Sequence, residues 1–400
     1  MRIAWISPSP LLPTGLGKVT RYLTQGLMRR GYEVIIGNPH YAGHPIYIEG
    51  IKHYPLVNAS HIPRFLRAVR PDVVVVYGSH WVPPYNQVSK ICDKLGLKVL
   101  YYVTVEFSSV SKHFLEPLAY VNFIATPSNF GKEVMVRHGI PDDRVMVVPH
   151  GVDTKIFRPF NAKFGGFEDY FFYGMVARNN LRKEFPVVIR AFAQLPIDVK
   201  ERSMLYLHTS LQEENVSWSG VLRGWDLSTI IAKYGLTNKV LMPSEGDKWW
   251  GVDEEELAQI YNALDVYVHA SSGEGFGLPI LEAMACGKPV IASNNTAIPE
   301  VVGDAGILIP CFEEDMETAE GFTVATTRIK PFTEAMARLF YDDNLRKTLS
   351  QRAIERAKQF TWDKAVRLIE KAIHETLNHG RIGMQILKKW LAPKQTPNNP

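Results

Sequence analysis

The chain has 400 residues, of which 46% are hydrophobic, 22% charged and 11% aromatic, and this globular composition excludes a largely disordered, fibrous or collagenous protein. Its net charge of +4 is too small for a strong nucleic-acid footprint, so no nucleic acid is expected as a partner. Three widely separated cysteines, Cys92, Cys286 and Cys311, exclude a disulfide framework and favour a reducing, cytoplasmic location. The length predicts two or three domains, and the apolar runs are too short for a membrane-spanning helix.

The N-terminal part alternates short apolar runs with helical patterns. Runs at 3–6 and 33–37 predict strands, and between them a helical pattern over 19–30 ends at Gly31. Further predicted strands lie at 72–77, 98–104, 122–125 and 144–148. Because these runs are continuously apolar, they favour strands of a parallel sheet buried between two helical layers.

A second series of the same kind follows a Pro- and Gly-rich junction at 158–166. Its predicted strands lie at 170–176, 204–208, 239–242, 266–269, 289–292 and 306–309. The remaining C-terminal part, 362–391, is a helical pattern interrupted at 378–380, and the tail 392–400 is predicted to be disordered. The fold class is therefore α/β, with two doubly wound domains. In such sheets ligands bind beyond the carboxyl ends of the strands.

The loop after the strand at 266–269 carries the clearest functional signal. Gly273, Gly275 and Gly277 precede a helix that begins near Leu278 or Pro279. Glycines let a ligand approach the backbone, and the helix N-terminus attracts an anion such as a diphosphate. Glu274 and Glu282 flank this site and suit the hydroxyl pairs of a ribose or a sugar, although a buried helical glutamate can also be purely structural.

Two cations follow the first strand of the second domain, which should open at the same sheet edge. Arg178 can bind phosphate oxygens with its planar fork, and Lys183 can act as a point charge. Taken alone, Arg and Lys after a strand are more often solvated surface residues. The predicted glycine loop nearby favours a role in anion binding.

These motifs together resemble the retaining GT-B glycosyltransferases of the group 1 class, family four. The paired-glutamate motif E-x7-E is similar to Glu274 and Glu282, and G-R-x4-K is similar to Ala177-Arg178 to Lys183, with Ala in place of Gly. Segments 147–157 and 299–306 resemble two further family motifs, and Gly15-Leu16-Gly17 resembles the opening glycine loop. The resemblance covers about residues 1–375.

The resemblance implies an N-terminal acceptor domain over 1–160, completed by a C-terminal helix at about 376–391 that crosses back to it. It also implies a donor domain over 167–375 and a central cleft between two Rossmann-like domains. The implied activity is retaining, metal-independent transfer of a hexose from a nucleotide-diphosphate sugar, with UDP-glucose or GDP-mannose as the leading donors. It requires no cofactor. The acceptor and the oligomeric state are left open.

The resemblance also assigns roles to the residues in those motifs. Arg178 and Lys183 would hold the diphosphate, Glu282 the ribose and Glu274 the donor sugar. The loop of Gly15, Leu16 and Gly17 would close over the phosphates or the acceptor. The remaining donor contacts would come from the backbone of the glycine loop: Gly275, Phe276, Gly277 and Leu278.

One position departs from the family pattern. Many relatives carry a histidine where this chain has Glu106, after the strand that ends Val103-Thr104-Val105. Glu106 is either an active-site acid or a loop glutamate, with His80 and His113 as nearby alternatives. A sugar-nucleotide-binding protein without transfer activity is therefore the second hypothesis. A Rossmann dehydrogenase is a third, but the loop at Gly15 and Gly17 lacks the third glycine of that motif.

Basic helical faces at 62–70 and near the C-terminus leave two further interpretations open. They are either solvated or in peripheral contact with an anionic membrane. Solvation is the preferred interpretation for the first of them, and packing on the first domain for the second.

Overall fold

The computed structural model describes residues 1–211, 214–217, 220–243, 251–312, 316–317 and 322–383. The predicted disordered tail at 392–400 lies outside these residues. The chain forms two compact units. Unit 1 contains Met1–Pro149, Phe322 and the C-terminal segment from Trp362, and unit 2 contains His150–Thr318 and Thr323–Thr361.

These boundaries differ from the expected ones in two places. The first boundary lies at Pro149 and not at 160–167, and the segment that returns to unit 1 begins at Trp362 and not near 376. The earlier boundary has a local reason, since the Val152 N–H donates to the Phe360 carbonyl inside unit 2 at 3.0 Å. The earlier return follows from α14 (Trp362–Asn378), which packs on α1 and on strands of unit 1.

Unit 1 is built on an eight-stranded sheet in the order β3-β4-β2-β1-β5-β6-β7-β8. All its pairs are parallel except β3 with β4, which pair antiparallel at the sheet edge. The strands are β1 (Arg2–Ile6), β2 (Glu33–Asn38), β3 (Ile46–Ile48), β4 (Ile51–Pro55), β5 (Val73–Tyr77), β6 (Val99–Tyr102), β7 (Phe123–Thr126) and β8 (Val145–Val147).

Helices of unit 1 bury their apolar faces against this sheet. On α2, Phe65 and Leu66 are in the core while Arg64 and Arg67 are exposed. On α14, Trp362 stacks on Tyr22 of α1 with ring centroids 4.6 Å apart. The helices besides α14 are α1 (Gly15–Arg29), α2 (His61–Val69), α3 (Tyr85–Lys94), α4 (Lys112–Leu115) and α5 (Asn129–Arg137), with short 3-10 helices at Glu116–Tyr120 and Asp142–Arg144.

Unit 2 is built on a six-stranded, wholly parallel sheet in the order β13-β10-β9-β14-β15-β16. Strand order reverses between the neighbours β9 and β14, the position where doubly wound sheets bind ligands. The strands are β9 (Phe171–Val176), β10 (Ser203–His208), β13 (Val240–Leu241), β14 (Val266–His269), β15 (Val290–Ser293) and β16 (Gly306–Ile309).

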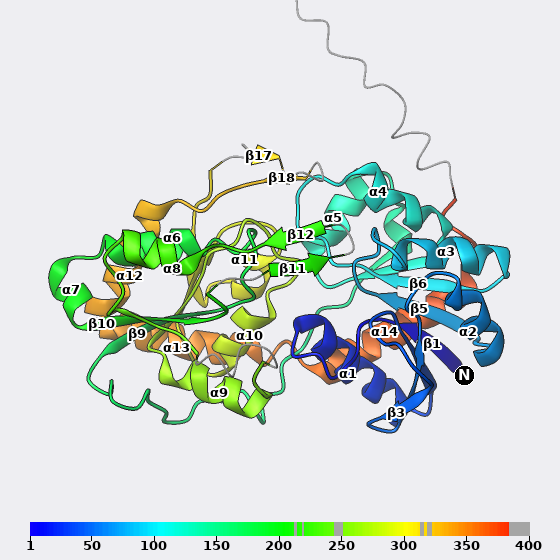
Figure 1. The fold of residues 1–400 in the computed structure, drawn as a ribbon, viewed down its shortest axis with the longest axis horizontal. Helices are drawn as coiled ribbons and strands as arrows, with labels where there is room; N and C mark the ends of the chain where they lie inside the picture. The colour runs from blue at the N-terminus through cyan, green and yellow to red at the C-terminus, as the bar shows by residue number, and fades with distance from the viewer. Residues whose placement is uncertain (212–213, 218–219, 244–250, 313–315, 318–321, 384–400) are drawn as a thin grey trace, which may run out of the picture. The chain divides into compact units, whose positions relative to one another are not determined.

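Helices cover both faces of this sheet (Figure 1). On one face α6 contacts α8 and α12, and on the other α10 contacts α9, α11 and α13. The helices are α6 (Phe185–Ala193), α7 (Ile197–Glu201), α8 (Leu227–Lys233), α9 (Glu254–Ala263), α10 (Leu278–Ala285), α11 (Ile298–Val302), α12 (Ile329–Tyr341) and α13 (Asp343–Ala357). Two small antiparallel hairpins complete the unit: β11 (Glu214–Ser217) with β12 (Gly220–Arg223), and β17 (Met316–Glu317) with β18 (Thr323–Val324).

All the strands predicted for the two parallel sheets are present, with ends shifted by two residues at most. The edge strand β3, its neighbour β4 and both hairpins were not predicted. β3 is only three residues long and largely exposed, and β4 contains Lys52 and His53, so neither is the continuous apolar run of a buried strand. Among the described residues, no helix combines the length and the apolar character needed to cross a bilayer.

Candidate functional site

The glycine loop of unit 2 leads from β14 into α10 as predicted. Gly277 is the N-cap of the helix with φ of +101°, a left-handed conformation that favours glycine, and no side chain caps the helix. A Cβ at this position would also lie 3.2 Å from Ile280 Cδ1. Proline at the second helical position, Pro279, has no N–H to satisfy.

Four consecutive backbone N–H groups at this turn have no acceptor among the described residues. They are the N–H groups of Gly275, Phe276, Gly277 and Leu278. All four residues are buried, and all four were predicted to bind the donor. Buried N–H groups are normally paired, and those at a helix N-terminus attract negative charge. The turn is therefore chemically suited to an anion.

Two loops are joined directly beside this turn. Lys183, in the loop after β9, forms an antiparallel bridge with Ser271, in the loop after β14. The Ser272 N–H donates to the Arg182 carbonyl at 3.0 Å, and the Glu184 N–H donates to the Ala270 carbonyl at 3.1 Å. The cation loop and the glycine loop are thus brought together, as the parallel sheet predicts.

Glu274 lies at the centre of the joined loops and is only 6% exposed. Its Oε1 accepts from Lys183 Nζ and lies 2.8 Å from His269 Nε2, while its Oε2 lies 3.1 Å from Arg182 Nη1. Burial by itself would raise the pKa of Glu274, but the charges of Lys183 and Arg182 outweigh burial and hold that pKa well below its usual range. The carboxylate is therefore ionised.

The two predicted cations differ in their surroundings. Lys183 is buried against Glu274, whereas Arg178 is exposed, and the second cation in contact with Glu274 is Arg182. The sequence analysis missed Arg182 and also His269. Arg182 directly precedes a motif residue, and His269 ends β14 five residues before Glu274, so the available signals were adjacency and a strand carboxyl end.

Glu282 lies inside α10 and is 3% exposed. Its Oε2 accepts a hydrogen bond from the Tyr261 hydroxyl of α9 at 3.0 Å. Burial and the nearby Glu282 carboxylate raise the pKa of Tyr261 well above its usual value, so the phenol keeps its proton and donates. Glu282 therefore has a fixed orientation. Its predicted contact with a ribose stays a prediction.

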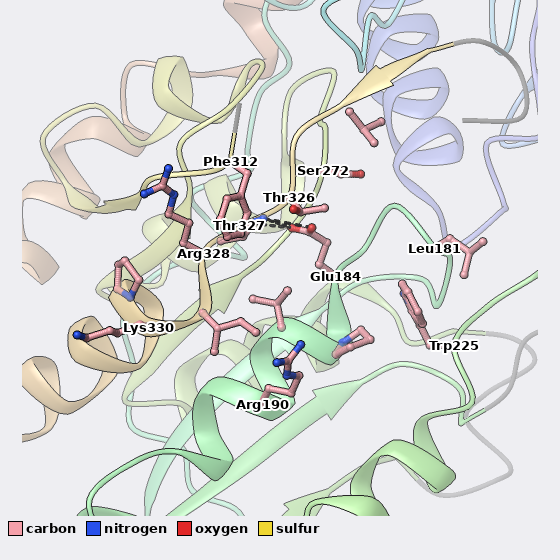
Figure 2. A pocket seen from close by; sticks show the side chains of 15 residues that line it. Leu181, Glu184, Arg190, Trp225, Ser272, Phe312, Thr326, Thr327, Arg328 and Lys330 are labelled. Atoms are coloured by element: carbon pink, nitrogen blue, oxygen red, sulfur yellow. Dashed lines mark hydrogen bonds between the residues drawn. The ribbon is translucent and has the colours of Figure 1, made fainter. Parts of the chain in front are cut away.

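A pocket of about 740 Å³ lies between α6 and α12, and neither Lys183 nor Glu274 lines it (Figure 2). Glu184, the residue after Lys183, lies at this pocket. Its carboxylate accepts from Thr327 Oγ1 at 2.5 Å and from the Thr327 N–H at 3.2 Å. Burial raises the pKa of Glu184 to about 7, although the Thr327 hydrogen bonds oppose this rise. The pocket is thus separate from the Glu274 cluster.

The site residues predicted for unit 1 lie after its own strands. The loop of Gly15, Leu16 and Gly17 forms the first turn of α1, where Thr14 Oγ1 accepts from the Gly17 N–H at 3.2 Å. Glu106 is half-buried beyond β6. Burial raises the pKa of Tyr77, and the charge of Glu106 adds to that rise, so the two side chains lie near each other.

The histidine alternatives near Glu106 differ in their surroundings. His80 is 1% exposed, and its Nε2 lies 2.9 Å from the Phe114 carbonyl. Burial lowers the pKa of His80 to about 3, which that hydrogen bond opposes only in part. His113 is exposed. His80 thus has the surroundings of a neutral core histidine.

Comparison with known proteins extends this description. The family described as Glycosyl transferases group 1 matches residues 157–356, and Glycosyltransferase Family 4 matches residues 13–156. The chain is 28% identical over 268 residues to O-antigen chain mannosyltransferase B of Escherichia coli, across 64% of this chain and 61% of that protein. It is 30% identical over 228 residues to a D-inositol 3-phosphate glycosyltransferase of Actinosynnema mirum, across 55% and 49%. The alignments thus span about half to three-fifths of these relatives.

Two solved structures have a similar fold. HepE of Anabaena, in complex with UDP-glucose, aligns with a TM-score of 0.72 at 16% identity, over 94% of this chain and 99% of that chain. Sucrose-phosphate synthase of Thermosynechococcus elongatus aligns with a TM-score of 0.71 at 18% identity, with the same coverage. At these identities the likeness is one of fold. Together with the two family matches, it shows that the chain has the GT-B fold and belongs to the group 1 glycosyltransferases.

Proposed function

We propose that the chain is a glycosyltransferase that moves a hexose from a nucleotide-diphosphate sugar to an acceptor, with retention and without a metal ion or other cofactor. The observation that carries this proposal is the buried helix turn at 275–278, with four N–H groups that have no acceptor among the described residues, joined to a loop of cations. The family match and the nucleotide-sugar complex of HepE, a protein of the same fold, support it.

Charge balance at the joined loops supports a diphosphate as the anion. Arg182, Lys183 and Glu274 together carry one net positive charge when His269 is neutral, and Arg178 adds a second. A sugar-linked diphosphate carries about two negative charges at neutral pH. The turn and these cations would stabilise the charge that develops when the bond between the sugar C1 and the phosphate oxygen breaks, which is the electrostatic role that a metal ion performs elsewhere.

The remaining chemistry is a substitution at C1. An acceptor hydroxyl forms the new bond to C1 and loses its proton, and the nucleoside diphosphate leaves with the electron pair. Glu274, ionised and beside the turn, would bind the donor sugar, and Glu282 the ribose. Glu106, which lies in unit 1, would act as an active-site acid. UDP-glucose and GDP-mannose are the donors that we would test first, and a peripheral membrane contact through α2 stays a prediction.

The first experiment measures donor binding by thermal shift. UDP-, GDP- and ADP-sugars are added to the parent and to Arg178→Gln, whose exposed side chain can be replaced without disturbing the core. A donor at about 100 times its Kd stabilises by about 2.7 kcal/mol, which corresponds to a shift of several degrees. Arg178→Gln should reduce that shift, while Lys347→Ala, an exposed cation on α13, should not. The absence of a shift with every donor would refute the donor site.

The second experiment measures nucleotide release with candidate acceptors. Transfer predicts release that is suppressed in Lys183→Gln and Arg178→Gln and unaffected by EDTA. Tight binding without turnover on any acceptor would instead favour the second hypothesis, a sugar-nucleotide-binding protein. In that case Glu106→His, which restores the residue common among relatives, is the variant to test for recovered activity.

A further inference from the structure

A buried chain of polar groups lies behind Glu274. His269, the last residue of β14, has no exposed surface. Its Nε2 lies 2.8 Å from Glu274 Oε1, and its Nδ1 lies 3.1 Å from the hydroxyl of Tyr267. The Tyr267 hydroxyl oxygen also lies 3.2 Å from the Val176 carbonyl oxygen of β9, a second acceptor within reach of its single proton. These hydrogen-bonded groups therefore connect the Glu274 carboxylate to the central strands of the sheet.

The charges around these hydrogen-bonded groups determine which atoms carry the protons. Because Glu274 is ionised, its oxygens can only accept, so the His269 nitrogen that faces Oε1 must carry a proton. Burial lowers the pKa of His269, and the hydrogen bond with Glu274 offsets this only in part, so the ring is neutral. A neutral ring protonated at Nε2 has Nδ1 as an acceptor, so the single proton of the Tyr267 hydroxyl goes to Nδ1 at 3.1 Å and not to the Val176 carbonyl at 3.2 Å. The surroundings thus select one tautomer.

Lys183 and His269 share the same oxygen of Glu274 but have different freedom. If the proposed function holds, the diphosphate attracts Lys183 and competes with Glu274 for its ammonium group. His269 has no such competitor, because it is a neutral donor with no surface to expose to a ligand. When the donor binds, His269 is the partner that keeps Oε1 in place.

We propose, on the basis of the proposed function, that His269 is a positioning residue of the transfer reaction. Its Nε2–H holds the Glu274 carboxylate toward the donor sugar while Lys183 engages the diphosphate, and Tyr267 holds the imidazole in the required orientation. His269 itself touches neither substrate. The inference goes beyond the paired-glutamate motif because it assigns a function to a residue outside that motif.

The kinetic test compares two substitutions of similar length. His269→Gln keeps an amide N–H at about the reach of Nε2, whereas His269→Met fills the space without a donor. We expect His269→Met to lower kcat by about 10- to 100-fold, the usual effect of losing a hydrogen bond to a charged group, with less than about a 3-fold change in donor KM. His269→Gln should recover most of kcat. Equal losses in both variants, or no loss in either, would overturn the proposal.

A second measurement does not depend on turnover. Nitrogen-15 spectra of histidine-labelled protein, with the His269 signals identified by their loss in His269→Gln, report the tautomer directly. The proposal requires a neutral ring protonated at Nε2 between about pH 6 and pH 8. A ring protonated at Nδ1, or an imidazolium, would overturn it. If the spectra agree but the parent neither binds nor turns over a nucleotide sugar, the proposed function has failed and the positioning role fails with it, while the tautomer assignment stands.

Discussion

Two of the buried carboxylates of unit 2, Glu274 and Glu184, lie in surroundings of opposite character. Glu274 is held by Lys183, Arg182 and His269, whereas Glu184 accepts hydrogen bonds from Thr327. Their exposed fractions are nearly equal, at 6% and 5%. Even so, the pKa of Glu274 is well below its usual range, and burial raises that of Glu184 to about 7. The difference shows that the nearby cations, and not the depth of burial, keep Glu274 charged.

Consecutive residues create this difference. Lys183 forms a single-residue bridge with Ser271, and Glu184 is the N-cap of α6 with φ of −76° and ψ of 54°, so the chain turns between the two residues. Lys183 reaches Glu274 at the glycine loop, and Glu184 reaches Thr327 at the pocket shown in Figure 2. A single stretch of chain therefore places an anionic site on one side and a carboxyl that favours its neutral form on the other.

The largest expected effect comes from neutralising Glu274. Glu274→Gln leaves Lys183 buried without its counter-ion, and breaking a buried pair in this way costs about 3 to 5 kcal/mol. Chemical or thermal unfolding of the variant measures the loss. The matched control is Asp343→Asn, an exposed acid that pairs with Lys347, for which little or no loss is expected. Equal losses in the two variants would show that the Glu274 cluster contributes no more than a surface pair.

The next largest effect is a change in the free energy of unfolding with pH, caused by the titration of Glu184. Its folded pKa of about 7 lies above the unfolded value of about 4.5, so the folded state retains a proton that the unfolded chain has released. Stability from this group is therefore greatest at low pH and is lost as pH rises from about 4.5 to 7, by about 3 kcal/mol.

Unfolding measured across pH 4.5 to 8 tests this assignment by comparison of the parent with Glu184→Gln. The stability difference between them should change across that range, because Gln does not titrate. By contrast, the difference between the parent and Glu274→Gln should be constant from about pH 5 to 8, because the folded pKa of Glu274 lies below this window. A constant difference for Glu184→Gln would mean that Glu184 is ionised in the folded state.

The smallest effect comes from Thr327→Val, which keeps the shape of the side chain and removes its hydroxyl. Glu184 then loses its 2.5 Å hydrogen bond but keeps the Thr327 N–H, so the expected cost is about 1 kcal/mol. Because that hydroxyl favours the ionised carboxylate, the pKa of Glu184 should rise further. The pH at which stability levels off should move upward with it, and an unchanged profile would show that burial alone determines this pKa.

Most of the strands, and the helix start beside Glu274, could be predicted from the sequence. Continuous apolar runs located the parallel strands of both sheets except β4, and Gly277 with Pro279 located the start of α10. The edge strand β3 and its neighbour β4 could not be found in this way, because neither is a continuous apolar run buried on both faces. The early return of the chain at Trp362 was also missed, because an amphipathic helix does not indicate which core it packs against.

By itself the sequence determined the α/β class, the glycine turn at α10 and the pair of glutamates around it. These features follow from local spacing, backbone freedom and the period of apolar residues. Only the tertiary structure decided that Arg182 and not Arg178 contacts Glu274, that His269 lies behind it, and that Glu184 and Glu274 have pKa values shifted in opposite directions. Those outcomes depend on distances between groups far apart in the chain and on burial, which residue spacing does not encode.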